Sequence, residues 1–96
     1  MISDNISLTD LSSIENIINN NEIILLKFDY EDSKYNNFID NIGFKIVNIT
    51  DSEIINFYEI EILPTILVYK NKNLIDSIKG FHTKTSLIKK ISTIIQ

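Results

Sequence analysis

Residues 58–80 read YEIEILPTILVYKNKNLIDSIKG and contain the clearest folding signal in the chain. Pro64 precedes the run 65–69, whose apolar and β-branched side chains are typical of a buried strand. Asn71-Lys72-Asn73 predicts a turn, because asparagine adopts left-handed backbone angles more readily than most residues. Residues 74–78 return as a second strand, which Gly80 ends. The segment therefore predicts an antiparallel hairpin.

Strands and helices alternate in the part of the chain before this hairpin. The stretch 23–28 is apolar on both faces, as in a central strand that is covered from two sides. Thr9 is the predicted cap of a helix whose apolar residues recur at helical spacing. The other predicted elements are strands at 5–8 and 44–49, helices at 33–42 and 51–58, and a last helix that begins at Thr83 or Thr85. The order βαβαβαββα predicts an α/β fold, with a central mixed sheet flanked by helices.

This order and several local matches resemble thioredoxin over essentially the whole chain. The segment 58–65, in which a tyrosine and an isoleucine lead to Pro-Thr, is similar to the stretch before the family's proline. Residues 69–71, followed by Gly80, are similar to its hairpin and the glycine after it. Residues 6–10 and 47–50 resemble its first and third strands. The resemblance implies a thioredoxin fold formed by a single domain, 1–96.

The resemblance also implies a peptide-binding groove. In the family the proline is cis and lies beside the dithiol, where the neighbouring backbone pairs with a bound peptide. By resemblance the bond before Pro64 is cis, and a protein or peptide partner is expected at this position. The predicted groove consists of Ser33, Lys34, Tyr35, Leu63, Pro64 and Thr65.

The chain lacks the groups that give the family its redox chemistry. It contains no cysteine, which excludes disulfides, thiolate nucleophiles and cysteine-ligated metals. The family's buried aspartate corresponds to Lys27, and the lysine that pairs with it corresponds to Ile46. The second helix is predicted to be shortened, because fewer residues separate the motif from the third strand. The positions that correspond to the Cys-X-X-Cys motif hold Ser33, Lys34, Tyr35 and Asn36.

Individual side chains near this loop have both a structural and a functional interpretation. Lys27 is predicted to pair with a carboxylate or to extend to an edge, and the alternative is a reactive amine. Ser33 is predicted to cap the next helix, and the alternative is a hydroxyl that binds a thiol. Asp29, Glu31 and Asp32 lack the spacing of a calcium loop and predict a solvated loop.

Composition excludes several classes of function. A formal charge of -4 and scattered lysines argue against nucleic-acid binding. The longest apolar run, 23–26, is too short to cross a membrane, and Asp4-Asn5 interrupts any signal-peptide pattern, so we expect an intracellular, cytoplasmic protein. A single histidine, His82, is expected on the surface, and no metal or cofactor is predicted. The 22 isoleucines and 12 asparagines, with no alanine or arginine, indicate an AT-rich genome. Some viruses have such genomes, and for a viral protein the alternative location is the virion.

The predicted function is a non-catalytic thioredoxin-like module that binds a protein or peptide. Retention of the Pro-Thr strand together with loss of every redox group motivates it. The alternative is a structural or assembly subunit that self-associates as a homo-oligomer, because the many isoleucines and the shortened helix would leave apolar surface exposed. A non-redox enzyme that uses Ser33 or Lys27 is the third hypothesis.

Overall fold

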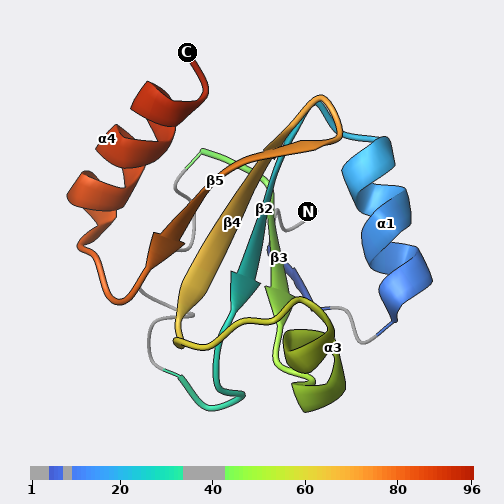
Figure 1. Cartoon of the computed structure of the whole chain (residues 1–96). Coiled ribbons are helices and arrows are strands. Elements are labelled where there is room, and N and C mark those ends of the chain that lie inside the picture. Colours follow the sequence, from blue (N-terminus) through green and yellow to red (C-terminus); the bar gives the residue numbers. More distant parts are fainter. Residues whose placement is uncertain (1–4, 8–9, 34–42) are drawn as a thin grey trace.

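A five-stranded mixed sheet forms the centre of the computed structural model, which describes residues 5–7, 10–33 and 43–96 (Figure 1). The elements are β1 (Asn5–Ser7), α1 (Leu11–Asn19), β2 (Ile23–Phe28), β3 (Ile46–Ile49), α3 (Ser52–Phe57), β4 (Thr65–Lys70), β5 (Asn73–Lys79) and α4 (Lys84–Ile94). These elements follow the predicted order. The predicted second helix, at 33–42, lies almost entirely outside the described residues.

The strands lie in the order β1-β3-β2-β4-β5, and their directions follow from the connections between them. β3 is parallel to both β1 and β2, as expected where long crossovers join the strands. β4 is antiparallel to β2 and to β5. A two-residue loop at Asn71 and Lys72 joins β4 to β5, and both residues have positive φ (51° and 73°), which suits the twist of a hairpin.

Helices cover both faces of the sheet (Figure 1). On one face, Leu87 and Ile91 of α4 pack against strand residues such as Leu25. On the other face, α1 contributes Ile14 and Ile18 to a second apolar cluster. α3 adds Ile54 to the same cluster. Because β2 is central and buried on both sides, the prediction from its apolar sequence is confirmed.

The residues that cap the helices differ from the prediction for α1 and settle the choice of cap for α4. Asp10, and not Thr9, caps α1: its carboxylate accepts the backbone N–H of Ser12 at 3.1 Å. This hydrogen bond lowers the pKa of Asp10 below its usual value. Asp51 caps α3 in the same way. Of the two threonines predicted to cap α4, Thr83 is the cap.

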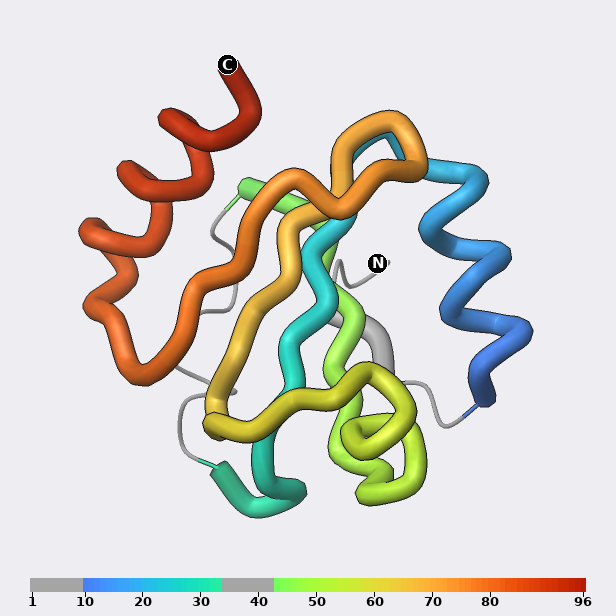
Figure 2. Tube along the Cα trace, in the orientation of Figure 1, coloured from blue at the N-terminus to red at the C-terminus, as the bar shows by residue number. Residues whose placement is uncertain are grey.

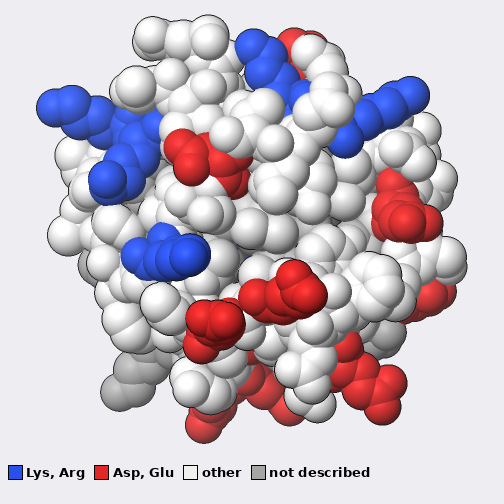
Figure 3. Space-filling model, in the orientation of Figure 1, with Lys and Arg blue, Asp and Glu red and all other residues white. Residues whose placement is uncertain are grey.

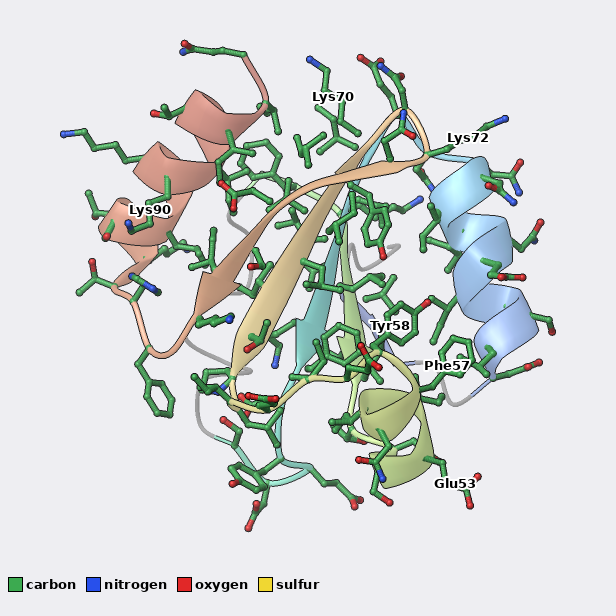
Figure 4. The ribbon with its side chains drawn as sticks, viewed as in Figure 1. Glu53, Phe57, Tyr58, Lys70, Lys72 and Lys90 are labelled. Carbon is green, nitrogen blue, oxygen red and sulfur yellow. The ribbon has the colours of Figure 1, made fainter. Side chains whose placement is uncertain are left out.

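Tyr58 follows α3 and ties that short helix to the sheet (Figure 4). Its ring centroid lies 5.2 Å from that of Phe28 on β2. Burial raises the pKa of Tyr58 from 10.0 to about 12, and repulsion from Tyr69 and Glu15 adds to the shift. The folded state therefore holds this phenolic proton more tightly than the unfolded chain does.

We expect Tyr58 to make the fold sensitive to alkali. Its contribution is fully present below pH 10.0 and is lost as the pH rises toward about 12, because a raised folded-state pKa favours the protonated form. In urea unfolding across this range, Tyr58→Phe should lose less stability with rising pH than the unmodified chain. Tyr30→Phe, which alters an exposed ring, is the control and should follow the unmodified chain. Parallel curves for all three proteins would contradict the assignment.

Candidate functional site

Segments that are far apart in the sequence meet at one end of the sheet, where β2 and β5 end and β4 begins (Figure 2). Phe28, at the end of β2, lies opposite Thr65, at the start of β4. Thr65 in turn lies opposite Lys79, at the end of β5. The residues that follow β2, precede β4 and follow β5 therefore share this end of the sheet. It contains the predicted groove residues Leu63, Pro64 and Thr65.

The Leu63–Thr65 segment is held by a small set of hydrogen bonds. The Leu63–Pro64 peptide bond is cis, and Pro64 is buried. The Pro64 carbonyl accepts the N–H of Gly80 at 2.8 Å, and Gly80 has the positive φ (84°) that glycine adopts readily. The Thr65 hydroxyl, which is also buried, donates to the Ile62 carbonyl at 2.5 Å. These contacts fix the backbone beside Leu63.

Large apolar side chains are exposed in the segments that adjoin the paired ends of β2, β4 and β5: Tyr30 two residues after Phe28, Phe81 two residues after Lys79, and Ile62 just before Leu63. Phe81 is 71% exposed, Tyr30 64% and Ile62 49%. Leu63 is half-buried, and its side chain packs against the apolar cluster on the α1 and α3 side of the sheet. Within the described part of the chain, the backbone of Leu63 makes no hydrogen bond to other backbone groups. We call the set Tyr30, Ile62, Leu63, Pro64 and Phe81 the Pro64 edge.

A groove of about 330 Å³ adjoins the Pro64 edge on the α3 side of the sheet. Ile62 and Thr65 line the end of the groove that meets this edge. Two acidic side chains, Glu59 and Glu61, and one cation, Lys79, lie along its walls. The groove is therefore polar at its rim, whereas the adjoining edge is apolar.

The structure places part of the predicted motif near this edge. Ser33 is half-buried, and its N–H donates to the Tyr30 carbonyl at 3.2 Å in the turn after β2. Lys34, Tyr35 and Asn36 lie outside the described residues. The predicted cap of the second helix therefore stays a prediction.

A buried polar cluster lies on the sheet face that α4 shares, next to the edge. Lys27 is fully buried, and its Nζ lies 3.8 Å from the Asp29 Oδ2. The prediction of a solvated loop is confirmed for Glu31 and Asp32, which are exposed, and is wrong for Asp29, which is only 1% exposed. Its N–H bonds to the Ile49 carbonyl of β3 at 3.1 Å, which holds the residue inside. Asn48, the register partner of Lys27, places a buried Oδ1 beside this pair.

The cluster accounts for the lysine in the central strand. Residues two apart on a strand share a face, so Asp29 can lie beside Lys27. A distance of 3.8 Å is an electrostatic contact rather than a hydrogen bond. The other carboxylate oxygen of Asp29 accepts the Tyr30 N–H at 2.7 Å. The prediction that Lys27 pairs with a carboxylate is confirmed.

The sequence contains one indication that Asp29 is buried, although its acidic neighbours indicate a solvated loop. Asp29 follows an apolar strand and continues the spacing of Leu25 and Lys27, which indicates the same face. Because Glu31 and Asp32 follow it closely, the same residue also fits a solvated acidic loop. Asn48 has no distinguishing spacing, and only the register of β2 and β3 places it beside Lys27.

Among the described residues, neither metal ligands nor a membrane-spanning helix can be identified. No group of three or more His, Asp or Glu side chains within 5–7, 10–33 and 43–96 is arranged to hold a metal ion. No helix in the same ranges has both the length and the apolar character needed to span a bilayer. His82, half-buried, places Nε2 3.2 Å from the Lys79 carbonyl.

Comparison with known proteins shows the fold of the chain. No protein-family model matches it, and no curated protein is significantly similar in sequence. It is similar to a mutant thioredoxin from Halobacterium salinarum, with 11% identity, a TM-score of 0.80, and coverage of 100% of this chain and 96% of that one. Thioredoxin from Plasmodium falciparum has 25% identity, a TM-score of 0.70, and coverage of 92% and 97%. Mitochondrial thioredoxin 3 from Saccharomyces cerevisiae has 21% identity, a TM-score of 0.75, and coverage of 92% and 93%.

The chain therefore has the thioredoxin fold, as predicted. It has no cysteine, so none of its own side chains can carry out dithiol exchange. The similarity of the structures leaves the role of the Pro64 edge to be argued from its geometry.

We expect Lys27 and Asp29 to be strongly coupled. Lys27→Met leaves a buried carboxylate without its cation, which should cost about 3–5 kcal/mol of unfolding free energy. Asp29→Asn removes the negative charge beside Lys27, and its amide oxygen can still accept the hydrogen bond from the Tyr30 N–H. The double variant should be more stable than the sum of the two losses predicts. Urea unfolding followed by circular dichroism measures all three.

Lys90→Met is the control, because it removes an exposed lysine from α4 and should change stability by less than about 0.5 kcal/mol. If the losses from Lys27→Met and Asp29→Asn add to within about 0.5 kcal/mol in the double variant, the two charges are not coupled.

Proposed function

We propose that the chain is a non-catalytic module that binds an extended segment of another protein at the Pro64 edge. The observation that carries the proposal is the backbone of Leu63. Its N–H and carbonyl have no backbone partner in the described part of the chain, exposed Ile62 precedes it, and exposed Phe81 follows Gly80, which bonds to the Pro64 carbonyl.

The chemistry of this edge suits an extended peptide. Unpaired backbone groups at a rigid edge can receive an added strand, whose hydrogen bonds supply affinity independent of sequence. The exposed apolar side chains supply contacts for alternate side chains of the ligand. Large exposed aromatic residues such as Phe81 and Tyr30 are typical anchors of binding surfaces.

The hydrogen bonds around Pro64 support a preformed site. Gly80 holds the Pro64 carbonyl and Thr65 holds the Ile62 carbonyl, so Leu63 is flanked on both sides by fixed backbone. A site that is ordered before binding loses less conformational entropy when the ligand arrives. Because Thr65 is buried, a test of the edge has to alter the exposed residues around it.

The proposal predicts that the affinity for apolar peptides falls when the exposed side chains of the Pro64 edge are removed. Peptides selected from a random displayed library should bind the unmodified chain, and Ile62→Ser combined with Phe81→Ser should weaken binding about tenfold or more, because anchors of this kind dominate peptide affinity. Fluorescence anisotropy measures the affinity, and NMR should show the Leu63 amide among the most shifted signals.

Ile75→Ser is the control, because Ile75 is also an exposed apolar residue but lies on β5 away from the Pro64 edge. An equal loss in Ile75→Ser would overturn the proposal. A library that yields no binder, or a Leu63 amide that does not move, would overturn it as well.

A self-associating assembly subunit is the second candidate. Leu74 and Ile75 on β5 are 54% and 40% exposed, although apolar side chains on a strand are usually covered. If this surface joins copies of the chain, light scattering should give a mass that rises with concentration, and Leu74→Glu should return it to the monomer value. A constant monomer mass would exclude this candidate.

A further inference from the structure

β5 forms one edge of the sheet, and its outer side is open. It pairs only with β4 among the described strands. An edge strand offers a row of backbone donors and acceptors to any extended segment that can lie beside it. Proteins commonly protect such edges, and charge is one means of protection.

A groove of about 630 Å³ runs along this open side, between β5 and α4. Residues 76–79 of β5 form one wall. The other wall comes from α4 and includes Ser86, Lys89 and Lys90. Because consecutive residues of β5 line it, the groove follows the backbone edge of the strand rather than one of its faces. We call it the lysine groove.

The lysine groove is basic, although the chain as a whole is acidic. Lys79, Lys89, Lys90 and His82 line it, and Asp76 is its single acid. The Asp76 carboxylate already accepts the N–H of the next residue, at 2.7 Å. In Figure 3, lysines lie on the left, over the α4 side, and along the top, whereas most acidic side chains lie at the bottom and right and one acidic patch lies beside the lysines on the α4 side.

The sequence separates charge in the same way. Six of the nine lysines, but only one of the 13 acidic residues, lie in 70–96. This part of the chain therefore has five more positive than negative charges, whereas the whole chain carries -4. A net-negative protein repels acidic ligands in general, so a basic groove on it selects where such a ligand can bind.

We propose that the lysine groove binds an acidic, extended segment of another protein, which adds to the sheet as a strand beside β5. The outer side of β5 supplies backbone hydrogen bonds from its remaining outward-pointing groups. Within 76–79, the Ser77 N–H already bonds to the Asp76 carboxylate, and the Lys79 carbonyl to the His82 ring. Lys89 and Lys90 on α4 face the same groove and supply the charge that selects acidic side chains. The site is separate from the Pro64 edge, so it does not depend on the function proposed for that edge.

The test uses a labelled peptide of alternating glutamate and valine, with the lysine–valine peptide as its charge-reversed counterpart. The glutamate peptide should bind the unmodified chain, and its affinity should fall as salt rises above about 0.1 M, where the screening length is only about 10 Å. The lysine peptide should not bind. Hydrogen exchange of the outward-pointing Lys79 amide should slow when the glutamate peptide is bound, whereas the Ser77 amide is already bonded to the Asp76 carboxylate.

The decisive variant is Lys89→Glu combined with Lys90→Glu, which should weaken the glutamate peptide about tenfold or more, because two attractions become repulsions. Lys79 is left unchanged because it lines both grooves. Lys72→Glu is the matched control: Lys72 is an exposed lysine in the hairpin, far from Lys90, and its change should leave affinity within about twofold (Figure 4). Circular dichroism checks that each variant is folded.

Several outcomes would overturn the proposal. Equal binding of both peptides, or an equal loss in Lys72→Glu, would show only general charge attraction. Unchanged hydrogen exchange of the β5 amides in 76–79 would exclude strand addition. If the chain instead associates with itself at the lysine groove, the occupant is a second copy and not an acidic segment of another protein. Loss of binding in the Ile62→Ser and Phe81→Ser variant, with Lys89→Glu and Lys90→Glu unaffected, would assign the peptide to the Pro64 edge instead.

Discussion

The fold depends on covering β2 from both sides. β2 lies between β3 and β4, and all but the first of its six residues are buried. A strand in this position needs a layer of helices on each face, which α4 supplies on one face and α1 with α3 on the other. It also leaves no route to water for a charged side chain at its centre. Lys27 is therefore held by a carboxylate from the same strand end, and Asp29 is drawn inside.

Much of the fold could be predicted from the sequence because its signals are local. The apolar run 23–28 predicts a central strand, and Asn71 with its neighbours predicts the hairpin. Less of the site could be predicted, because it depends on which segments meet. The pairing of Phe28 with Thr65 and of Thr65 with Lys79 assembles the edge, and no spacing in the sequence shows that Phe81 and Tyr30 share it. Asp29 lies after the end of β2, as its acidic neighbours indicate, but those neighbours give no sign that its side chain is buried.

The chain keeps the backbone of the thioredoxin fold at the Pro64 edge but has none of the side chains needed for dithiol chemistry. Backbone groups around Pro64 remain fixed by Gly80 and Thr65, whereas the chain has no cysteine at all. The buried charge is also arranged differently: the lysine occupies the central strand and the acid follows it. The missing cysteines exclude dithiol exchange by the chain's own side chains. Peptide binding at the Pro64 edge is the function proposed for the backbone that remains.

Charge then distinguishes the two grooves. Glu59 and Glu61 line the groove at the Pro64 edge, whereas Lys89 and Lys90 line the groove beside β5. Lys79, the last residue of β5, contributes to both. A ligand that suits one groove by charge is disfavoured by the other, because like charges across an interface cost free energy. Two partners, or two oppositely charged segments of one partner, would thus be directed to opposite sides of β5, because Ser77 and Lys79 line both grooves while the charged walls differ.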